Sequence, residues 1–434
     1  MTGRGFLAMA WRNLWRNRRR SLATVASIAC GLAAVAVFAG YKLAIYTGLA
    51  NIAIHSDLAG HLTINKAGWR TEGKLHPARY LFDEAEIAQV RVTVTAVAPG
   101  ARVVERMNVM GLVSNGHNST IFVANGVGPA DMRLLRGPFQ GIPGVLREHS
   151  PHGVIMSSGL ADILGLKVGD SASILVNTIH GQANMADIDI DAAVDTGNLA
   201  TNDKWMTMPL ELAQEQLDAM GKAEGLTVLL PAAVNAPAFE GRASEEAMYT
   251  TPAPDDETTN ALRDTLSAAL ARTGLHTEMI TWQEQSPFYR QVKSMFDMMF
   301  GLLLGVVLAI VILSVANAMG MAVVERTREI GTLRAIGMRR AGVVRLFVTE
   351  AALLVVVGLL VGVALTFLVR AGVNALDVRY IPPSLSRDVQ LYVGFDLLPT
   401  IAAALALAVL ATLAATVPAR RAAHAPIVSS LGHV

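Results

Sequence analysis

Four long apolar stretches constrain this chain more than any other feature of its sequence. They occupy residues 22–45, 296–324, 346–369 and 397–417, and each is long enough to cross a bilayer, which takes about 20 residues. Of the 434 residues, 52% are apolar and only 16% are charged, whereas about a quarter is charged in an average soluble domain. The sequence therefore predicts an α-helical membrane protein with four transmembrane helices.

Arginine-rich flanks predict the orientation of these four spans. Five arginines lie between residues 12 and 20, six lie between the second and third spans, and two follow the fourth span. Because short arginine-rich segments stay in the cytoplasm, both termini and residues 325–345 are expected there. Residues 46–295 and 370–396 are then expected outside. Residues 46–295 carry 18 basic and 28 acidic side chains although the whole chain has a net charge of +1, which agrees with a separate compartment.

The two ends of the chain are expected on the cytoplasmic face of the membrane. Residues 1–21 are predicted to form an amphipathic helix that lies on the membrane surface, because apolar side chains recur at helical spacing among arginines. Residues 418–434 are predicted to form a cytoplasmic tail. The first span is interpreted as a retained anchor, since its apolar run exceeds the roughly 7–15 residues of a cleavable signal peptide.

Residues 46–295 predict a large mixed α/β domain between the first and second spans. Helical periodicity covers residues 210–220 and 258–272, while residues 236–256 read as a loop. From Phe288 onward little breaks a helix, so the second span is expected to start outside the membrane as a stalk. Runs typical of strands cover residues 61–65, 90–97, 119–124, 153–156, 171–177, 187–191 and 226–230.

The motifs that this sequence lacks exclude several function classes. It contains no G-x-x-x-x-G-K-[ST] loop, so the chain is not expected to bind ATP and Mg²⁺ in the P-loop manner. No catalytic or metal-binding constellation of side chains is recognisable, and the single cysteine, Cys30, allows no disulfide framework. The balanced charge gives no reason to expect nucleic acid as a partner.

The segment between the second and third spans predicts a short amphipathic helix. Ile330, Leu333 and Ile336 supply apolar contacts, arginine and glutamate supply the polar face, and Gly337 is expected to end the helix. On these residues alone, the segment could equally be a solvated linker at the membrane surface.

This segment resembles a known family. Glu325–Gly337, which reads ERTREIGTLRAIG, is similar to the cytoplasmic loop of FtsX/MacB-type (type VII) ABC transporter permeases, the group that includes LolC and LolE. Trp11–Ser21 resembles the N-terminus of that family, and Gly153–Leu175 resembles a stretch of its periplasmic domain. The order of spans and outside domain agrees as well.

The resemblance implies the membrane subunit of an ABC transporter in a bacterial inner membrane. Two copies of a separate cytoplasmic ATPase would hold ATP and Mg²⁺ and would drive two permease chains, either two copies or a paralogous pair. As in LolC and LolE, no ATPase is expected within this chain, because its first span begins near residue 22. The family's coupling helix, which seats in the ATPase, carries over to Glu329, Ile330, Gly331, Thr332, Leu333, Arg334, Ala335, Ile336 and Gly337.

Motion of the helices would then do work on the periplasmic side, a process called mechanotransmission. The expected work is release of a lipoprotein or lipid, or efflux of an amphiphile, with or without a periplasmic carrier or adaptor protein. The alternative is an FtsX-like regulator that activates a periplasmic partner, such as a cell-wall hydrolase, and transports nothing. An outside domain of about 250 residues favours the transporter.

Two further sets of residues have two interpretations each. Apolar residues at the outer ends of spans one and two suit contact with cargo or with plain membrane lipid; they are Val35, Phe38, Tyr41, Ile45, Phe296, Met299 and Phe300. Two G-x-x-x-G pairs allow helices to approach closely, either between two copies or within one subunit; they are Gly301 with Gly305 and Gly358 with Gly362.

Overall fold

The computed structural model describes residue 12 and residues 18–73, 75–140, 144–239, 241–381, 388–424 and 426. The chain divides into two compact units. The helical unit comprises Met1–Ala44, Lys293–Val378 and Leu391–Val434, and the α/β unit comprises Ile45–Val292 and Arg379–Gln390. The amphipathic helix predicted for residues 1–21 lies almost entirely outside the described residues, as does most of the predicted tail.

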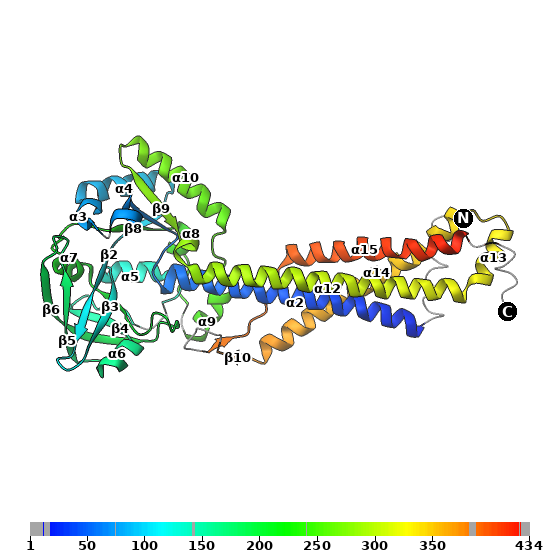
Figure 1. Cartoon of the computed structure of the whole chain (residues 1–434), viewed down its shortest axis with the longest axis horizontal. Coiled ribbons are helices and arrows are strands. Elements are labelled where there is room, and N and C mark those ends of the chain that lie inside the picture. The colour runs from blue at the N-terminus through cyan, green and yellow to red at the C-terminus, as the bar shows by residue number, and fades with distance from the viewer. Residues whose placement is uncertain are drawn as a thin grey trace. The chain divides into compact units, whose positions relative to one another are not determined.

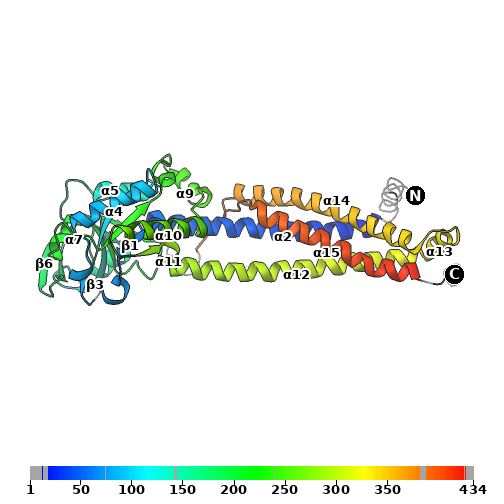
Figure 2. The same ribbon diagram turned by 90° about the horizontal axis from the view of Figure 1, so that it is seen from above.

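Among the described residues, four helices are long and apolar enough to cross a membrane. They contain the four predicted spans in full, and they are α2 (Arg18–Asn51), α12 (Pro287–Glu325), α14 (Arg340–Ala375) and α15 (Leu397–His424) (Figures 1 and 2). With 39 residues, α12 is roughly 60 Å long, about twice the hydrocarbon core of a bilayer. Its start at Pro287 confirms the helix predicted from Phe288 onward.

The core of the helical unit is built from residues spaced by one helical turn. Val307, Val311 and Val315 form such a stripe on α12, and small alanines, among them Ala411 and Ala415, form one on α15. A stripe of small and β-branched side chains lets neighbouring helix backbones approach closely. Among the described elements, α14 and α15 have the most extensive mutual contacts.

The α/β unit contains a nine-stranded sheet in the order β3-β7-β4-β6-β5-β2-β8-β1-β9. An additional pairing between β3 and β2 closes the first six strands into a barrel. The strands are β1 (Leu62–Lys66), β2 (Arg102–Ser114), β3 (Ser119–Gly126), β4 (Gly153–Ser157), β5 (Ser171–Asn177), β6 (Ala183–Val194), β7 (Trp205–Met208), β8 (Gly225–Leu229) and β9 (Thr277–Thr281).

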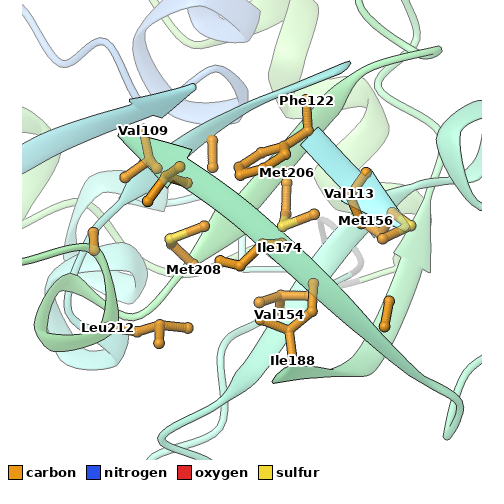
Figure 3. Close-up of a cluster of buried hydrophobic side chains, with 14 of the residues drawn as sticks. Val109, Val113, Phe122, Val154, Met156, Ile174, Ile188, Met206, Met208 and Leu212 are labelled. Atoms are coloured by element: carbon orange, nitrogen blue, oxygen red, sulfur yellow. The ribbon is translucent and has the colours of Figure 1, made fainter. Parts of the chain in front are cut away.

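The barrel closes around a core of buried apolar side chains (Figure 3). Alternation along β5 and the middle of β6 contributes to it: Ile188 and Ile190 of β6 are buried, while Asp187 and Asp189 are exposed. The predicted strand with an acidic outer face is therefore confirmed. Phe122 is the largest inward side chain in Figure 3 and lies fully buried.

The long strand β2 belongs to both parts of the sheet. Residues 107–114 pair with β3 in the barrel, whereas residues 102–106 pair with β8 in the open part. Helices α4 (Glu84–Val97) and α10 (Asp256–Arg272) cover that open part, where Val90, Leu226 and Leu266 share one buried cluster. The remaining helical segments of the unit are short: η1 (Ile52–Ser56), η2 (Trp69–Gly73), α3 (Pro77–Tyr80), α5 (Pro129–Arg136), α6 (Ser158–Leu164), α7 (Leu210–Gln216), α8 (Pro231–Val234), α9 (Gly241–Thr250) and α11 (Trp282–Gln285).

Two predictions for this unit are wrong. Residues 90–97 were predicted as a strand but form the second half of α4, because Asp83 and Glu86 form a capping box that starts a helix ahead of the valines. Residues 236–256 were predicted as a loop but contain α9. The other predicted strands and the helices at residues 210–220 and 258–272 are confirmed within a few residues of their ends. A two-stranded pair, β10 (Arg379–Tyr380) and β11 (Val389–Gln390), completes the unit.

Candidate functional site

The predicted coupling segment forms the short helix α13 (Thr327–Ala335) at the end of the helical bundle, where α12 meets α14 (Figures 1 and 2). It is separated from α12 by Arg326 alone. Gly337 ends it with a φ of +103°, a backbone conformation that glycine adopts without strain. The N–H groups of Gly337 and Met338 donate to the carbonyl oxygens of Arg334 and Leu333, which satisfies the last turn of the helix.

The two ends of α13 face different surroundings. Ile330 is buried in the core of the helical unit, in the same cluster as Val343 and Ala419. Ile336, at the C-cap, is 80% exposed, and Leu333 between them is half-buried. The three apolar residues therefore do not share one exposed face: Ile330 attaches the helix to its own bundle, and only Ile336, at the C-cap, is largely exposed.

The junction between α12 and α13 carries a buried ion pair. Nη1 of Arg326 donates to Oε2 of Glu350 on α14 at 2.9 Å, and Nε donates to Oε2 of Glu329 on α13 at 3.1 Å. The side chains of Arg326 and Glu350 are only 7% and 5% exposed, and the guanidinium lies 5.7 Å from the ring centroid of Phe347. Charges buried this deeply are tolerated only when they are paired.

Sequence reasoning did not find this ion pair. Two signals were present: a glutamate about one turn inside the third span, and an arginine directly after the second span. Ionisable residues within apolar spans usually have partners inside the bundle. A second pair links the same region to α2, with Arg20 and Glu325 at 2.9 Å, but its side chains are 25% and 48% exposed.

The structure brings four of the predicted cargo residues together. Phe38 stacks against Phe296 and Phe300 with ring centroids 6.1 and 6.2 Å apart, and Tyr41 lies 5.9 Å from Phe296. Lys42 lies 4.6 Å above the ring of Phe300 and pairs with Asp297 at 3.0 Å.

The three other predicted cargo residues do not join this aromatic cluster of Phe38, Tyr41, Phe296 and Phe300. Val35 is fully buried in the bundle core, so it is closed to a ligand. Ile45 belongs to the α/β unit. Met299 is 44% exposed on α12.

The two glycine pairs have different surroundings. A Cβ atom built on Gly358 would lie 2.7 Å from Cβ of Ile28, and one on Gly362 would lie 3.1 Å from Cβ of Leu32, so this pair packs α14 on α2 within one chain. A Cβ on Gly301 or Gly305 would meet no atom within 4 Å. That pair therefore lies on an open face of α12.

Comparison with known proteins identifies this helical segment. Residues 301–427, which include all of α13, α14 and α15 and residues 301–325 of α12, match the family model described as FtsX-like permease C-terminal. This part of the chain is therefore an FtsX-like permease segment. The nine residues of the predicted coupling helix all lie in the part of the permease that carries the family match.

Relatives of the permease are similar over short segments. The pyoverdine export ATP-binding/permease protein PvdT of Pseudomonas putida is 44% identical over 15% of this chain and 10% of its own length. The macrolide export ATP-binding/permease protein MacB of Escherichia coli is 41% identical over 15% of this chain and 10% of its own length. PvdT of Pseudomonas syringae pv. tomato is 36% identical over 27% of this chain and 16% of its own length. The permease thus spans at most 16% of the length of these relatives.

Among solved structures, the permease aligns with the periplasmic region of MacB from Actinobacillus actinomycetemcomitans. The alignment covers 52% of this chain and 89% of that one at 10% identity, with a TM-score of 0.32. A TM-score this low establishes no shared fold.

Proposed function

We propose that this permease is the membrane subunit of an ABC transporter and that a separate cytoplasmic ATPase docks on α13. The observation that carries the proposal is the exposed C-terminal end of α13, at Ile336, within the family segment. Ile336 there is 80% exposed, and Arg334 and Glu329 lie on the same short helix. An exposed apolar side chain bordered by charge is typical of the centre of a protein interface.

The ATPase, rather than this chain, would bind ATP and Mg²⁺, and two ATPase copies would serve two permease chains. The open pair Gly301 and Gly305 supports a second permease copy, or a paralogue, against α12. Closure of the ATPases would move α13 and, through it, α12, whose residues are divided between the helical and α/β units. This is mechanotransmission in a bacterial inner membrane, with both termini in the cytoplasm and the α/β unit in the periplasm.

The proposed cargo is an amphiphile, either the acyl part of a lipoprotein or lipid, or a small molecule for efflux. The aromatic cluster supports this class because it combines stacked rings with the charged pair Lys42 and Asp297. Relatives named for export of pyoverdine and macrolides favour transport over pure regulation of a periplasmic partner. ATP-dependent release of a fluorescent lipopeptide from proteoliposomes, with or without a periplasmic carrier or adaptor protein, would test transport directly.

Docking on α13 is tested by placing a charge on its exposed apolar residue. Burial of an isoleucine contributes roughly 1.5–3 kcal/mol, so Ile336→Asp should weaken ATPase binding by at least about tenfold. The fold should be unaffected because the side chain is already exposed. The measurement is co-purification of the ATPase with the full chain in detergent, together with ATP turnover of the reconstituted complex.

Leu376→Asp is the matched control for this experiment. Leu376 is 75% exposed at the other end of α14, so the same chemical change occurs in equally open surroundings. It should leave ATPase binding intact. If Ile336→Asp binds the ATPase as well as Leu376→Asp does, α13 is a solvated linker and the docking proposal fails.

A further inference from the structure

We propose that Arg326 is a positioning residue that fixes α13 to α14, so that a movement of α13 is passed to the third span as well as to the second. The proposal rests on ATPase docking at α13 for its functional meaning. Its structural part concerns the Arg326–Glu350 pair alone and can be tested without an ATPase.

The backbone at Arg326 is a single-residue joint. It is the one residue between the end of α12 at Glu325 and the start of α13 at Thr327, with φ −115° and ψ 18°. No side chain caps the N-terminus of α13 there. A joint of one non-helical residue leaves the direction of the second helix to be set by other contacts, since two dihedral angles can reorient everything that follows.

The side chain of Arg326 supplies those contacts. One guanidinium nitrogen donates to Glu350 on α14 and another donates to Glu329, one turn into α13. A planar guanidinium holds its donors in a fixed fork, so two acceptors on two helices fix the angle between those helices. A lysine could supply the charge but not this fixed pair of directions.

Stability alone does not account for a buried ion pair at this place. Replacing such a pair with apolar side chains of similar size is often neutral or stabilising. The surroundings would suit apolar side chains, because Phe347 and Ala351 beside Glu350 on α14 belong to the core cluster. Apolar side chains would not hold α13 at one angle to α14, because their contacts do not depend on direction as hydrogen bonds do. The one-residue joint at Arg326 requires such directional contacts.

The contacts that hold α13 to the rest of the bundle are made near its N-terminus. Arg326 and Ile330, one turn apart, attach the first half to α14 and to the bundle core. Ile336 and Gly337, which directly follow α13, are exposed. A partner that moves the exposed end of the segment at Ile336 would therefore turn α13 about its attachment and pull on Glu350, and thus on α14.

The first test measures the position of α13 without any ATPase. Spin labels on Thr332→Cys in α13 and Val356→Cys in α14, with Cys30→Ser as background, report the distance between these helices in the full chain. Both labelled positions are exposed. The native pair should give one narrow distance distribution. Arg326→Met combined with Glu350→Leu should broaden it, although this apolar pair should still fold and show an unchanged melting temperature.

Two further variants control for loss of an ion pair in general and for misfolding of the apolar pair. Glu325→Gln removes the exposed pair with Arg20, which has the same 2.9 Å separation one residue away, and should leave the distribution narrow. Arg326→Lys keeps the charge and should broaden the distribution to an intermediate degree, so it remains informative if the apolar pair misfolds. A narrow, native distribution in Arg326→Met/Glu350→Leu or in Arg326→Lys would overturn the proposal.

The second test adds the ATPase and a non-hydrolysable ATP analogue. Spin labels on Leu313→Cys in α12 and Val356→Cys in α14 measure the distance between these two helices. In the chain with the native Arg326–Glu350 pair, this distance should change when the nucleotide binds. In Arg326→Met/Glu350→Leu the ATPase should still co-purify, while the nucleotide-induced change in the distance between α12 and α14 should be lost. An undiminished change in that variant would refute transmission through the pair. Failure of the native chain to bind any ATPase would instead refute the proposed function and leave the first test to decide the structural role of Arg326.

Discussion

Burial keeps the imidazoles of His55 and His61 neutral in the α/β unit. Nδ1–H of His55 donates to the carbonyl oxygen of Leu135 at 2.8 Å, while Nδ1 of His61 accepts from the N–H of Leu230 at 3.2 Å. Desolvation lowers the pKa of His55 to about 4 and that of His61 to about 3, and the nearby His55 lowers the second value further. Protonation of His61 at Nδ1 would also remove the acceptor for Leu230.

We therefore expect the permease to lose stability in mild acid. Below about pH 6.5 the unfolded histidines take up protons and the folded ones do not, so the free energy of unfolding falls by up to about 1.4 kcal/mol per pH unit for each residue. The loss continues until the pH reaches the folded pKa values near 4 and 3. Urea unfolding of the full chain in detergent, followed by tryptophan fluorescence at pH 7.5 and 5.5, measures it.

The difference between two histidine variants isolates this effect from the titration of carboxylates. His61→Asn keeps an acceptor near the position of Nδ1 and should reduce the loss between pH 7.5 and 5.5. His180→Gln, at an exposed position, should leave the loss unchanged. If His61→Asn loses as much stability as the native chain, burial of the two rings is not the cause.

At the scale of the element, the stability of α13 depends on the residues at its two ends. Nine residues are too few for a stable isolated helix, so the joint at Arg326 and the turn at Gly337 define it. A Cβ at Gly337 would meet no atom within 4 Å, which leaves the φ of +103° as the only source of strain.

Gly337→Ala should therefore destabilise the turn by roughly 1–2 kcal/mol, the usual scale for a residue forced into such a conformation. Gly320→Ala is the matched control, and it should change the stability in the opposite direction. Gly320 also has open space around its Cβ position but lies inside α12, where alanine favours the helix by up to about 1 kcal/mol. Melting temperatures of the two variants in detergent measure the difference, and a shift of equal sign in both would contradict the argument.

At the scale of the whole molecule, the arrangement of charges predicts the topology. The α/β unit should lie outside the cytoplasm, and α13 should lie inside it, because arginines flank α13 on both sides. In a Cys30→Ser background, His180→Cys should react with a membrane-impermeant maleimide in intact cells. Thr332→Cys should react only after the membrane is opened.

Both positions are exposed in the structure, so lack of reaction reports the compartment rather than burial. Ser244, although it belongs to the α/β unit, is buried and would be a poor reporter. Labelling of Thr332→Cys but not of His180→Cys in intact cells would reverse the proposed topology and, with it, the docking of a cytoplasmic ATPase on α13.

The sequence by itself determined the four apolar spans, the existence of the α/β domain between the first two of them, and the helix between spans two and three. These features depend on runs of apolar residues and on local turn chemistry, which act over one element at a time. Gly165, for example, ends α6 in the left-handed conformation just before β5, as its place in the sequence predicts. The strand predicted for residues 90–97 failed because alternating valines were weighed above the capping box that precedes them.

Only the tertiary structure decided which face of each element is covered. It buried Ile330 and exposed Ile336, although both were predicted to face a partner, and it packed Gly358 and Gly362 within the chain while leaving Gly301 and Gly305 open. It also paired Arg326 with Glu350, 24 residues apart. A helical period specifies that one face is apolar, but the neighbour that covers this face is set by packing between segments far apart in the sequence.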